Sequence, residues 1–258
     1  MKNTNKRIIF LHLPKNAGTT MKSILKKKYS KEEVYQIEYN KDGVWNLNEF
    51  KELPQNEREN IKLLSGHFNF GLHEYFSTPS LYISMMRHPV ERTISFYNYV
   101  KRQKSHRLLD AVKNKSLIDC VKEVRDFDVV NGQSRKLSGT DDENLMLDKA
   151  LANIEQHFCF VGIQEHFEES MILLNEKLKL KVRYLSKLNS AGFKPHIDHE
   201  LIKEIEKTNQ VDMKLYNIME NRFFEELNRI KFLSTKKTLL RTASKLKPKY
   251  DKFVRKYL

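Results

Sequence analysis

The segment His12–Thr20, with the sequence HLPKNAGTT, combines residue types that bind phosphate groups. Its small residues Ala17 and Gly18 let an anion approach the backbone, while the two threonines and Lys15 supply hydroxyl and ammonium donors. A helix that begins here adds free N–H groups and the positive end of its dipole. The segment is not a Walker A motif, because its Lys precedes the last Gly. An ordinary strand-to-helix turn with a threonine cap explains the same residues equally well.

The second candidate is the segment Met85–Tyr97, with the sequence MMRHPVERTISFY. Arg87 leaves a predicted strand just before Pro89, which suits the first turn of a helix. On that helix Ser95 lies about two turns in, and Arg92 lies one turn before it. A guanidinium group with a hydroxyl group makes a clamp for a second phosphate, because arginine donates two parallel hydrogen bonds. Alternatively, Arg87 pairs with a carboxylate and Ser95 is a solvated helix residue.

The third candidate is a base. In the segment Lys62–Glu74 a predicted strand is followed by a glycine turn, and His67 emerges at the end of the strand. Imidazole is the side chain best matched to removing a proton near neutral pH. A single histidine is more often a hydrogen-bonded structural residue, and His73 and Glu74 are rival bases in the same segment.

These segments all follow predicted strands, and the chain alternates strands with helices. Short apolar runs predict strands over Arg7–Leu13, Val34–Ile37, Lys62–Ser65, Leu81–Met86, Phe158–Ile163 and Val182–Ser186. Apolar residues at helical spacing predict helices over Gly18–Lys28, Val90–Arg102, Leu117–Val124, Asn144–Glu155, Glu168–Leu178 and Asp212–Ile230. Such alternation indicates an α/β layered fold with a mostly parallel sheet. Ligands of such sheets bind at the carboxyl ends of the strands, where the candidate residues lie.

Length and composition exclude several classes of protein. The chain has 258 residues, of which 40% are hydrophobic and only 8 are Gly and 6 are Pro. This excludes wholesale disorder and collagen-like or low-complexity designs. The two cysteines suit a reducing compartment, and no window approaches the ~20 apolar residues that span a bilayer. We therefore expect a cytoplasmic protein.

The net charge of +14 is concentrated at the C-terminal end. Residues 231–258 contain ten Lys or Arg and one acid, Asp251. We predict a domain at 1–230 and a basic amphipathic helical tail at 231–258, which Pro248 divides into two helices. Such a tail suits the anionic inner face of a membrane, and a helix packed on the core with a solvated basic face is an equal alternative. Because the excess charge lies mostly in the tail and no nucleic-acid motif is present, we expect no nucleic-acid partner.

Taken together, the stretches FLHLPKNAGTT, SGHFNFGLHE and RHPVERTISFYNY resemble the sulfotransferases that use 3′-phosphoadenosine-5′-phosphosulfate (PAPS). Within this family the chain is similar to the carbohydrate 2-O-sulfotransferases and their bacterial relatives. Weaker matches follow at 130–139, 160–174 and 188–195, so the resemblance runs from about residue 7 to about residue 230. It implies a P-loop-like three-layer sandwich, and transfer of a sulfuryl group to an acceptor hydroxyl, most simply on a carbohydrate. The implied product is 3′,5′-adenosine bisphosphate (PAP), and no metal is implied.

The resemblance also implies roles for individual residues. His67 is implied as the catalytic base, and Lys15 as the group that stabilises the leaving phosphate. Arg87 and Ser95 are implied as the clamp for the 3′-phosphate. The other residues implied in nucleotide binding are Lys15 itself, Asn16, Ala17, Gly18, Thr19, Thr20, Ser190 and Lys194.

Two departures from the family pattern stand out. Asn16 replaces a Thr, although its amide can still bond a phosphate oxygen, and the triplet 65–67 is Ser-Gly-His where some relatives have His-x-His. The second departure leaves one histidine expected at this site, His67. Two alternative functions remain: a nucleotide-dependent phosphotransferase of P-loop type, which needs a Lys after Gly18 and an acidic magnesium ligand, and a non-catalytic polyanion-binding module.

Overall fold

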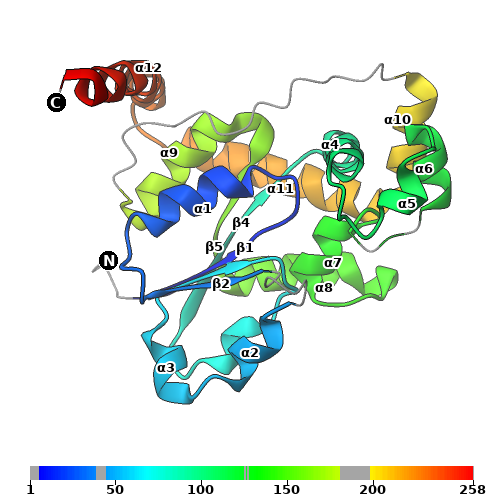
Figure 1. The fold of residues 1–258 in the computed structure, drawn as a ribbon, viewed down its shortest axis with the longest axis horizontal. Coiled ribbons are helices and arrows are strands. Elements are labelled where there is room, and N and C mark those ends of the chain that lie inside the picture. The colour runs from blue at the N-terminus through cyan, green and yellow to red at the C-terminus, as the bar shows by residue number, and fades with distance from the viewer. Residues whose placement is uncertain (1–5, 39–44, 125, 127, 181–197, 258) are drawn as a thin grey trace.

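Five strands form one parallel sheet in the order β2-β3-β1-β4-β5 (Figure 1). This computed structural model describes residues 6–38, 45–124, 126, 128–180 and 198–257, with side chains described as far as Lys245. The strands are β1 (Arg7–Leu11), β2 (Val34–Ile37), β3 (Leu63–Gly66), β4 (Ser80–Met86) and β5 (Phe158–Ile163). The predicted α/β fold with a parallel sheet is confirmed, and the predicted strand Val182–Ser186 lies outside the described residues.

Strand β1 occupies the middle of the sheet and is buried along its whole length. Leu11 at its end is paired with Gly66 of β3, and Phe10 is paired with Ile83 of β4. A strand covered on both faces needs a continuous apolar run, which the segment RIIFL supplies. Because the strands are parallel, the loops that follow β3, β1 and β4 emerge next to one another at a single edge of the sheet.

Helices cover both faces of the sheet and make a three-layer structure (Figure 1). Helices α1 (Gly18–Lys26) and α9 (Phe167–Leu178) lie on one face. The other face carries α2 (Leu47–Glu52), α3 (Gln55–Asn60) and α8 (Glu143–His157). Right-handed connections account for this division. From β1 to β2 the chain moves toward one edge of the sheet, which places α1 on one face. From β2 to β3 and from β4 to β5 it moves toward the other edge, which places α2, α3 and α8 on the opposite face.

A group of helices between β4 and β5, joined by α10 (His199–Thr208), gathers at one end of the molecule (Figure 1). It contains α4 (Pro89–Arg102), α5 (Leu109–Val112) and α6 (Leu117–Glu123), while α7 (Gly132–Ser138) packs against α8. The short 3-10 helices η1 (Leu72–Tyr75) and η2 (Gln164–His166) and the long α11 (Gln210–Asn228) complete the domain. Two small apolar clusters fix α4 in this group, one around Val90 and Ile94 and one around Phe96 and Val100.

The C-terminal segment forms one helix, α12 (Leu233–Tyr257), of 25 residues. The prediction that Pro248 divides it in two is wrong. A proline inside a helix removes one hydrogen bond and bends the axis, while the turns on either side keep their own bonds. Within the described ranges, no helix combines the length and the apolar character needed to cross a bilayer.

The first turns of α12 pack against α9, and the rest of the helix extends away from the sheet (Figure 1). Leu240 is 7% exposed in this contact. Three ion pairs surround it: Lys236–Glu176, Lys237–Glu169 and Arg241–Glu168. The start of the tail is therefore packed on the domain, which agrees with the alternative of a C-terminal helix packed on the core.

Candidate active site at the carboxyl edge of the sheet

The chain turns sharply between β1 and α1, where Lys15 and Ala17 both have left-handed backbone conformations, with φ of 69° and 54°. Such conformations cost about 1 kcal/mol for a residue other than glycine, and strain of this kind is typical of functional sites. The first helical hydrogen bond runs from the N–H of Met21 to the carbonyl of Ala17, at 3.2 Å. The N–H groups of residues 18–20 therefore point out of the helix start, with the geometry of an anion site.

Asn16 is fully buried and ties this loop to its neighbours. Its Nδ2 donates to the carbonyl of Met85 at 2.9 Å and to Oε1 of Gln133 at 2.7 Å. Both amide hydrogens are thereby used within the protein. Gln133, on α7, in turn accepts from the N–H of Arg87 at 3.0 Å and donates to its carbonyl at 2.9 Å. The loop after β1 and the end of β4 are thus joined through two buried amides.

The position of α7 is set by Asp212, a carboxylate on α11 that is fully buried. It accepts hydrogen bonds from the N–H groups of Gln133 at 3.1 Å and Ser134 at 2.6 Å. The guanidinium group of Arg92, also fully buried, lies 4.0 Å from it. Arg92 also donates to the carbonyls of residues 128 and 129. Arg92 therefore supports the site from the core, and it is not the guanidinium of a phosphate clamp.

Gly18 makes room for the ring of His12. A Cβ atom on Gly18 would lie 1.6 Å from Nε2 and 1.9 Å from Cδ2 of His12. On another side the His12 ring is stacked on Phe10, with 5.4 Å between centroids. From the sequence we expect Gly18 to let an anion approach the backbone. In the structure, the ring of His12 already requires a residue without a side chain at this position.

His12 and His67 lie side by side, because they follow the paired residues Leu11 and Gly66 on adjacent strands. Their ring centroids are 4.1 Å apart. Nδ1 of His67 lies 2.7 Å from the carbonyl oxygen of His12. A carbonyl only accepts, so Nδ1 carries the proton and Nε2 keeps its lone pair. The expectation of a single histidine at this site is wrong, since the second one comes from a different strand.

Both imidazoles are held in their neutral form. Burial lowers the pKa of His67 to about 4, and the charges of Lys136 and Lys22 act in the same direction. Burial and the neighbouring His67 lower the pKa of His12 well below 6.5. At pH 7 the Nε2 atom of His67 is therefore unprotonated, which is the state that a general base requires.

Lys15 lies on the other side of the loop, among further positive charges. Its Nζ is 4.2 Å from the ring centroid of Tyr99 on α4. Burial, together with the charges of Arg102 and Arg87, lowers the pKa of Lys15 from 10.5 to about 8. Like charges that lower one another's pKa are relieved by an anion placed between them. The electrostatics of this side therefore favour a ligand with negative charge.

Arg87 bridges the loop and α4. Its Nη1 donates to the carbonyl of Lys15 at 3.3 Å, and its Nη2 pairs with Glu91 at 3.3 Å. The Glu91 side chain is 50% exposed, so this pair contributes about 0–1 kcal/mol and a phosphate can replace it. Ser95, half-buried, lies one turn beyond Glu91 on the same face of α4. Arg87 thus lies just before α4, and Ser95 lies on the face of α4 that carries its partner Glu91.

The remaining predicted residues fall into three situations. Thr19 is exposed at the start of α1, whereas Thr20 is 7% exposed and faces the interior. His73 belongs to a separate aromatic cluster, where its Nδ1 lies 3.2 Å from Oη of Tyr82 and its ring 4.4 Å from that of His157. Ser190 and Lys194 lie outside the described residues.

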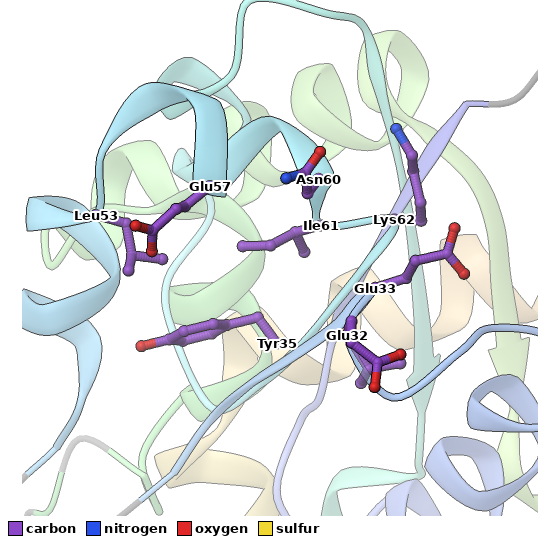
Figure 2. A pocket seen from close by; sticks show the side chains of 9 residues that line it. Glu32, Glu33, Tyr35, Leu53, Glu57, Asn60, Ile61 and Lys62 are labelled. Atoms are coloured by element: carbon purple, nitrogen blue, oxygen red, sulfur yellow. The ribbon is translucent and has the colours of Figure 1, made fainter.

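A cleft of about 520 Å³ opens at the opposite edge of the sheet, where β2 and β3 begin. Figure 2 shows the carboxylates of Glu32, Glu33 and Glu57 among the side chains around it. Negative charges at its rim repel a phosphate, so this cleft does not suit a nucleotide. Among the described residues, no group of three or more His, Cys, Asp and Glu side chains is arranged to hold a metal ion.

The close approach of the His12 ring to Gly18 predicts how a substitution of Gly18 changes stability. Gly18→Ala in the otherwise unchanged protein forces the His12 ring out of its place and lowers the free energy of unfolding by about 1–3 kcal/mol, measured by urea denaturation. In a His12→Ala background the same substitution has room for its methyl group and becomes neutral or stabilising, since alanine is the better helix former. Equal destabilisation in both backgrounds would show that Gly18 is needed for another reason.

Comparisons with known proteins identify the family of the chain. The sequence profile of the Sulfotransferase family matches residues 1–233. A crystal structure of mouse sulfotransferase SULT7A1 complexed with PAP aligns with 13% identity and a TM-score of 0.35, over 82% of this chain and 66% of that chain. A sulfotransferase from Alicyclobacillus acidocaldarius aligns with 12% identity and a TM-score of 0.47, over 83% of this chain and 96% of that chain. No curated protein sequence gives a match.

Both structural alignments are too distant to carry an argument, so the assignment rests on the sequence profile. The profile covers the loop after β1, the segment of His67, the segment of Arg87 and the helices that support them. The chain therefore belongs to the sulfotransferase family, whose members transfer sulfuryl groups.

Proposed function

We propose that the protein transfers the sulfuryl group of PAPS to a hydroxyl group of a carbohydrate acceptor in the cytoplasm, and releases PAP. The proposal rests on one observation: the carboxyl edge of the sheet has a neutral side and a cationic side. A neutral histidine, His67, lies on one side of the loop after β1, and a group of cations around Lys15 lies on the other. Membership of the family supports sulfuryl transfer. The carbohydrate acceptor rests on the resemblance of the sequence motifs to the 2-O-sulfotransferases.

The cationic side fits the phosphate groups of the donor. Lys15 and the N–H groups of residues 18–20 would hold the 5′-phosphosulfate, at the positive end of α1. Arg87 and Ser95 would hold the 3′-phosphate. The Nε atom of Arg87 is buried and lies 3.9 Å from Oε1 of Glu165, so Nη1 and Nη2 are the atoms of this guanidinium that the phosphate would engage. PAPS supplies the sulfuryl group, whose bond to the phosphate oxygen breaks as the bond to the acceptor oxygen forms.

The neutral side supplies the base. Nε2 of His67 takes the proton of the acceptor hydroxyl as that oxygen attacks in line. The resulting imidazolium keeps its Nδ1–H bond to the carbonyl of His12, which orients the ring before and after the transfer. On the far side of the loop Lys15 and the N–H groups stabilise the negative charge of the leaving phosphate.

The decisive measurement is a thermal shift with PAP, AMP and ATP–Mg²⁺ on wild type and on Arg87→Ala. We expect PAP alone to stabilise wild type, by about 2.7 kcal/mol at a hundred times its dissociation constant. Arg87→Ala loses this shift because the 3′-phosphate loses its guanidinium. The control is His67→Ala, which keeps the PAP shift while turnover of PAPS falls about a hundredfold or more. Stabilisation by ATP–Mg²⁺ and not by PAP would instead indicate phosphoryl chemistry.

The lowered pKa of Lys15 makes donor binding depend on pH. Lys15 is cationic below its pKa of about 8 and loses its charge as the pH rises through that value. The affinity for PAP, measured by isothermal titration calorimetry, should therefore decrease above about pH 8. Lys15→Arg, whose side chain stays charged over this range, should remove most of that decrease. An identical pH dependence in both proteins would mean that another group controls binding.

We also propose that the projecting part of α12 contacts an anionic membrane at its inner face. Beyond Arg241, the last ion pair with α9, the sequence holds six further Lys or Arg and one acid, Asp251. Each cation near an anionic surface contributes about 1 kcal/mol. Co-sedimentation with phosphatidylserine vesicles should decrease severalfold when the chain ends at Lys245, which keeps the contacts with α9. Equal binding of both chains, or binding to neutral phosphatidylcholine vesicles, would contradict this proposal.

A further inference from the structure

The order of the strands decides from which side an acceptor reaches the base. The loop after β1 has β4 and Arg87 on one side and β3 and His67 on the other, with β2 beyond β3. The donor proposed above occupies the side of Arg87. An acceptor whose hydroxyl meets Nε2 of His67 therefore lies over the ends of β3 and β2. The groups that follow β2 are candidates for contact with it.

Trp45 stands at this place. Its ring centroid is 6.3 Å from that of His67, and the two planes make an angle of 83°. The neighbouring Asn46 fixes it there, because Nδ2 of Asn46 donates to the carbonyl of Gln36 at 2.9 Å and its Oδ1 accepts from the N–H of Glu38 at 2.9 Å. Trp45 is half-buried, so it keeps some exposure to solvent.

Charged side chains border the same place. Lys22 lies one turn beyond Gly18 on α1 and hence on the side of His12, and the next turn, Lys26, reaches Gln36 of β2. Burial lowers the pKa of Lys22, while the charge of Glu38 acts in the opposite direction. A cation and a carboxylate therefore accompany Trp45 around the base.

This combination of groups fits the chemistry of a sugar ring. The faces of a pyranose carry C–H groups that pack on a rigid aromatic surface, and its rim carries hydroxyl groups that bond to charged donors and acceptors. A phenolic acceptor would also pack on Trp45, but it has no rim of hydroxyl groups for Lys22 and Glu38. The observations thus favour the sugar.

We propose that Trp45 is the acceptor platform of this enzyme: a pyranose ring packs on Trp45 and presents its hydroxyl to His67, with Lys22 and Glu38 at the rim of the ring. The inference rests on the proposed function and adds a residue that determines which acceptor is used.

Trp45 is the only tryptophan of the chain, so its fluorescence reports on this position alone. The probes are the methyl pyranosides of glucose, galactose, mannose and N-acetylglucosamine, with N-acetyltyrosinamide as the phenolic probe, each added to the protein saturated with PAP. We expect at least one pyranoside to change the emission of Trp45 saturably and to accept sulfate from PAPS. Absence of any change with all four pyranosides, or sulfation of N-acetyltyrosinamide alone, would overturn the proposal.

Variants separate a platform from a structural role. Trp45→Ala should raise the KM for the active pyranoside about tenfold with kcat within about twofold, and Trp45→Phe should restore most of the affinity. The matched control is Tyr35→Ala, which removes an aromatic ring of β2 that packs on Phe50, away from His67, and should leave KM unchanged. An unchanged KM in Trp45→Ala overturns the proposal. If PAP does not stabilise wild type in the thermal-shift experiment, the proposed function itself is refuted. The failure of the acceptor platform and the failure of the proposed function are therefore distinguishable.

Discussion

Gln133 is the junction on which the candidate site depends. Its one buried amide accepts from Asn16 and from the backbone of Arg87, and donates back to the carbonyl of Arg87. A buried amide that loses such partners leaves several polar groups unsatisfied, each at about 1–3 kcal/mol. Asp212 holds the same residue through its backbone N–H. The loop, the end of β4 and α7 are thus one rigid unit, supported by a helix nearly eighty residues further along the chain.

This unit separates two electrostatic environments within a single edge of the sheet. On the side of β3, burial keeps two imidazoles neutral, and on the side of β4, Lys15 and Arg87 concentrate positive charge. A base must be unprotonated to work, and a phosphate site must be cationic to bind, so the two need different surroundings at the same edge of the sheet. The backbone of the loop after β1 lies between the neutral and the cationic environment.

The sequence predicts the sheet well because a buried parallel strand has a local signature. All five described strands were expected, two of them, β2 and β5, with the bounds that the structure shows. It also predicts that the segments of Lys15, His67 and Arg87 meet, since each follows a parallel strand. It misses His12, because a His-x-His pattern lies within one segment, whereas His12 and His67 come together through the pairing of two strands. It misses Gln133 and Asp212 for a similar reason: no spacing in the sequence reveals which distant backbone a buried polar group will satisfy.

The contact between Gly18 and the ring of His12 has a consequence for how this sequence can diverge. The two positions share one volume, so neither changes freely while the other is kept. A relative with a small residue at the position of His12 has space for a methyl group or a hydroxymethyl group at the position of Gly18, and one that keeps the imidazole does not. Covariation between a strand end and a helix start would then be the trace that this shared volume leaves in an alignment of the family.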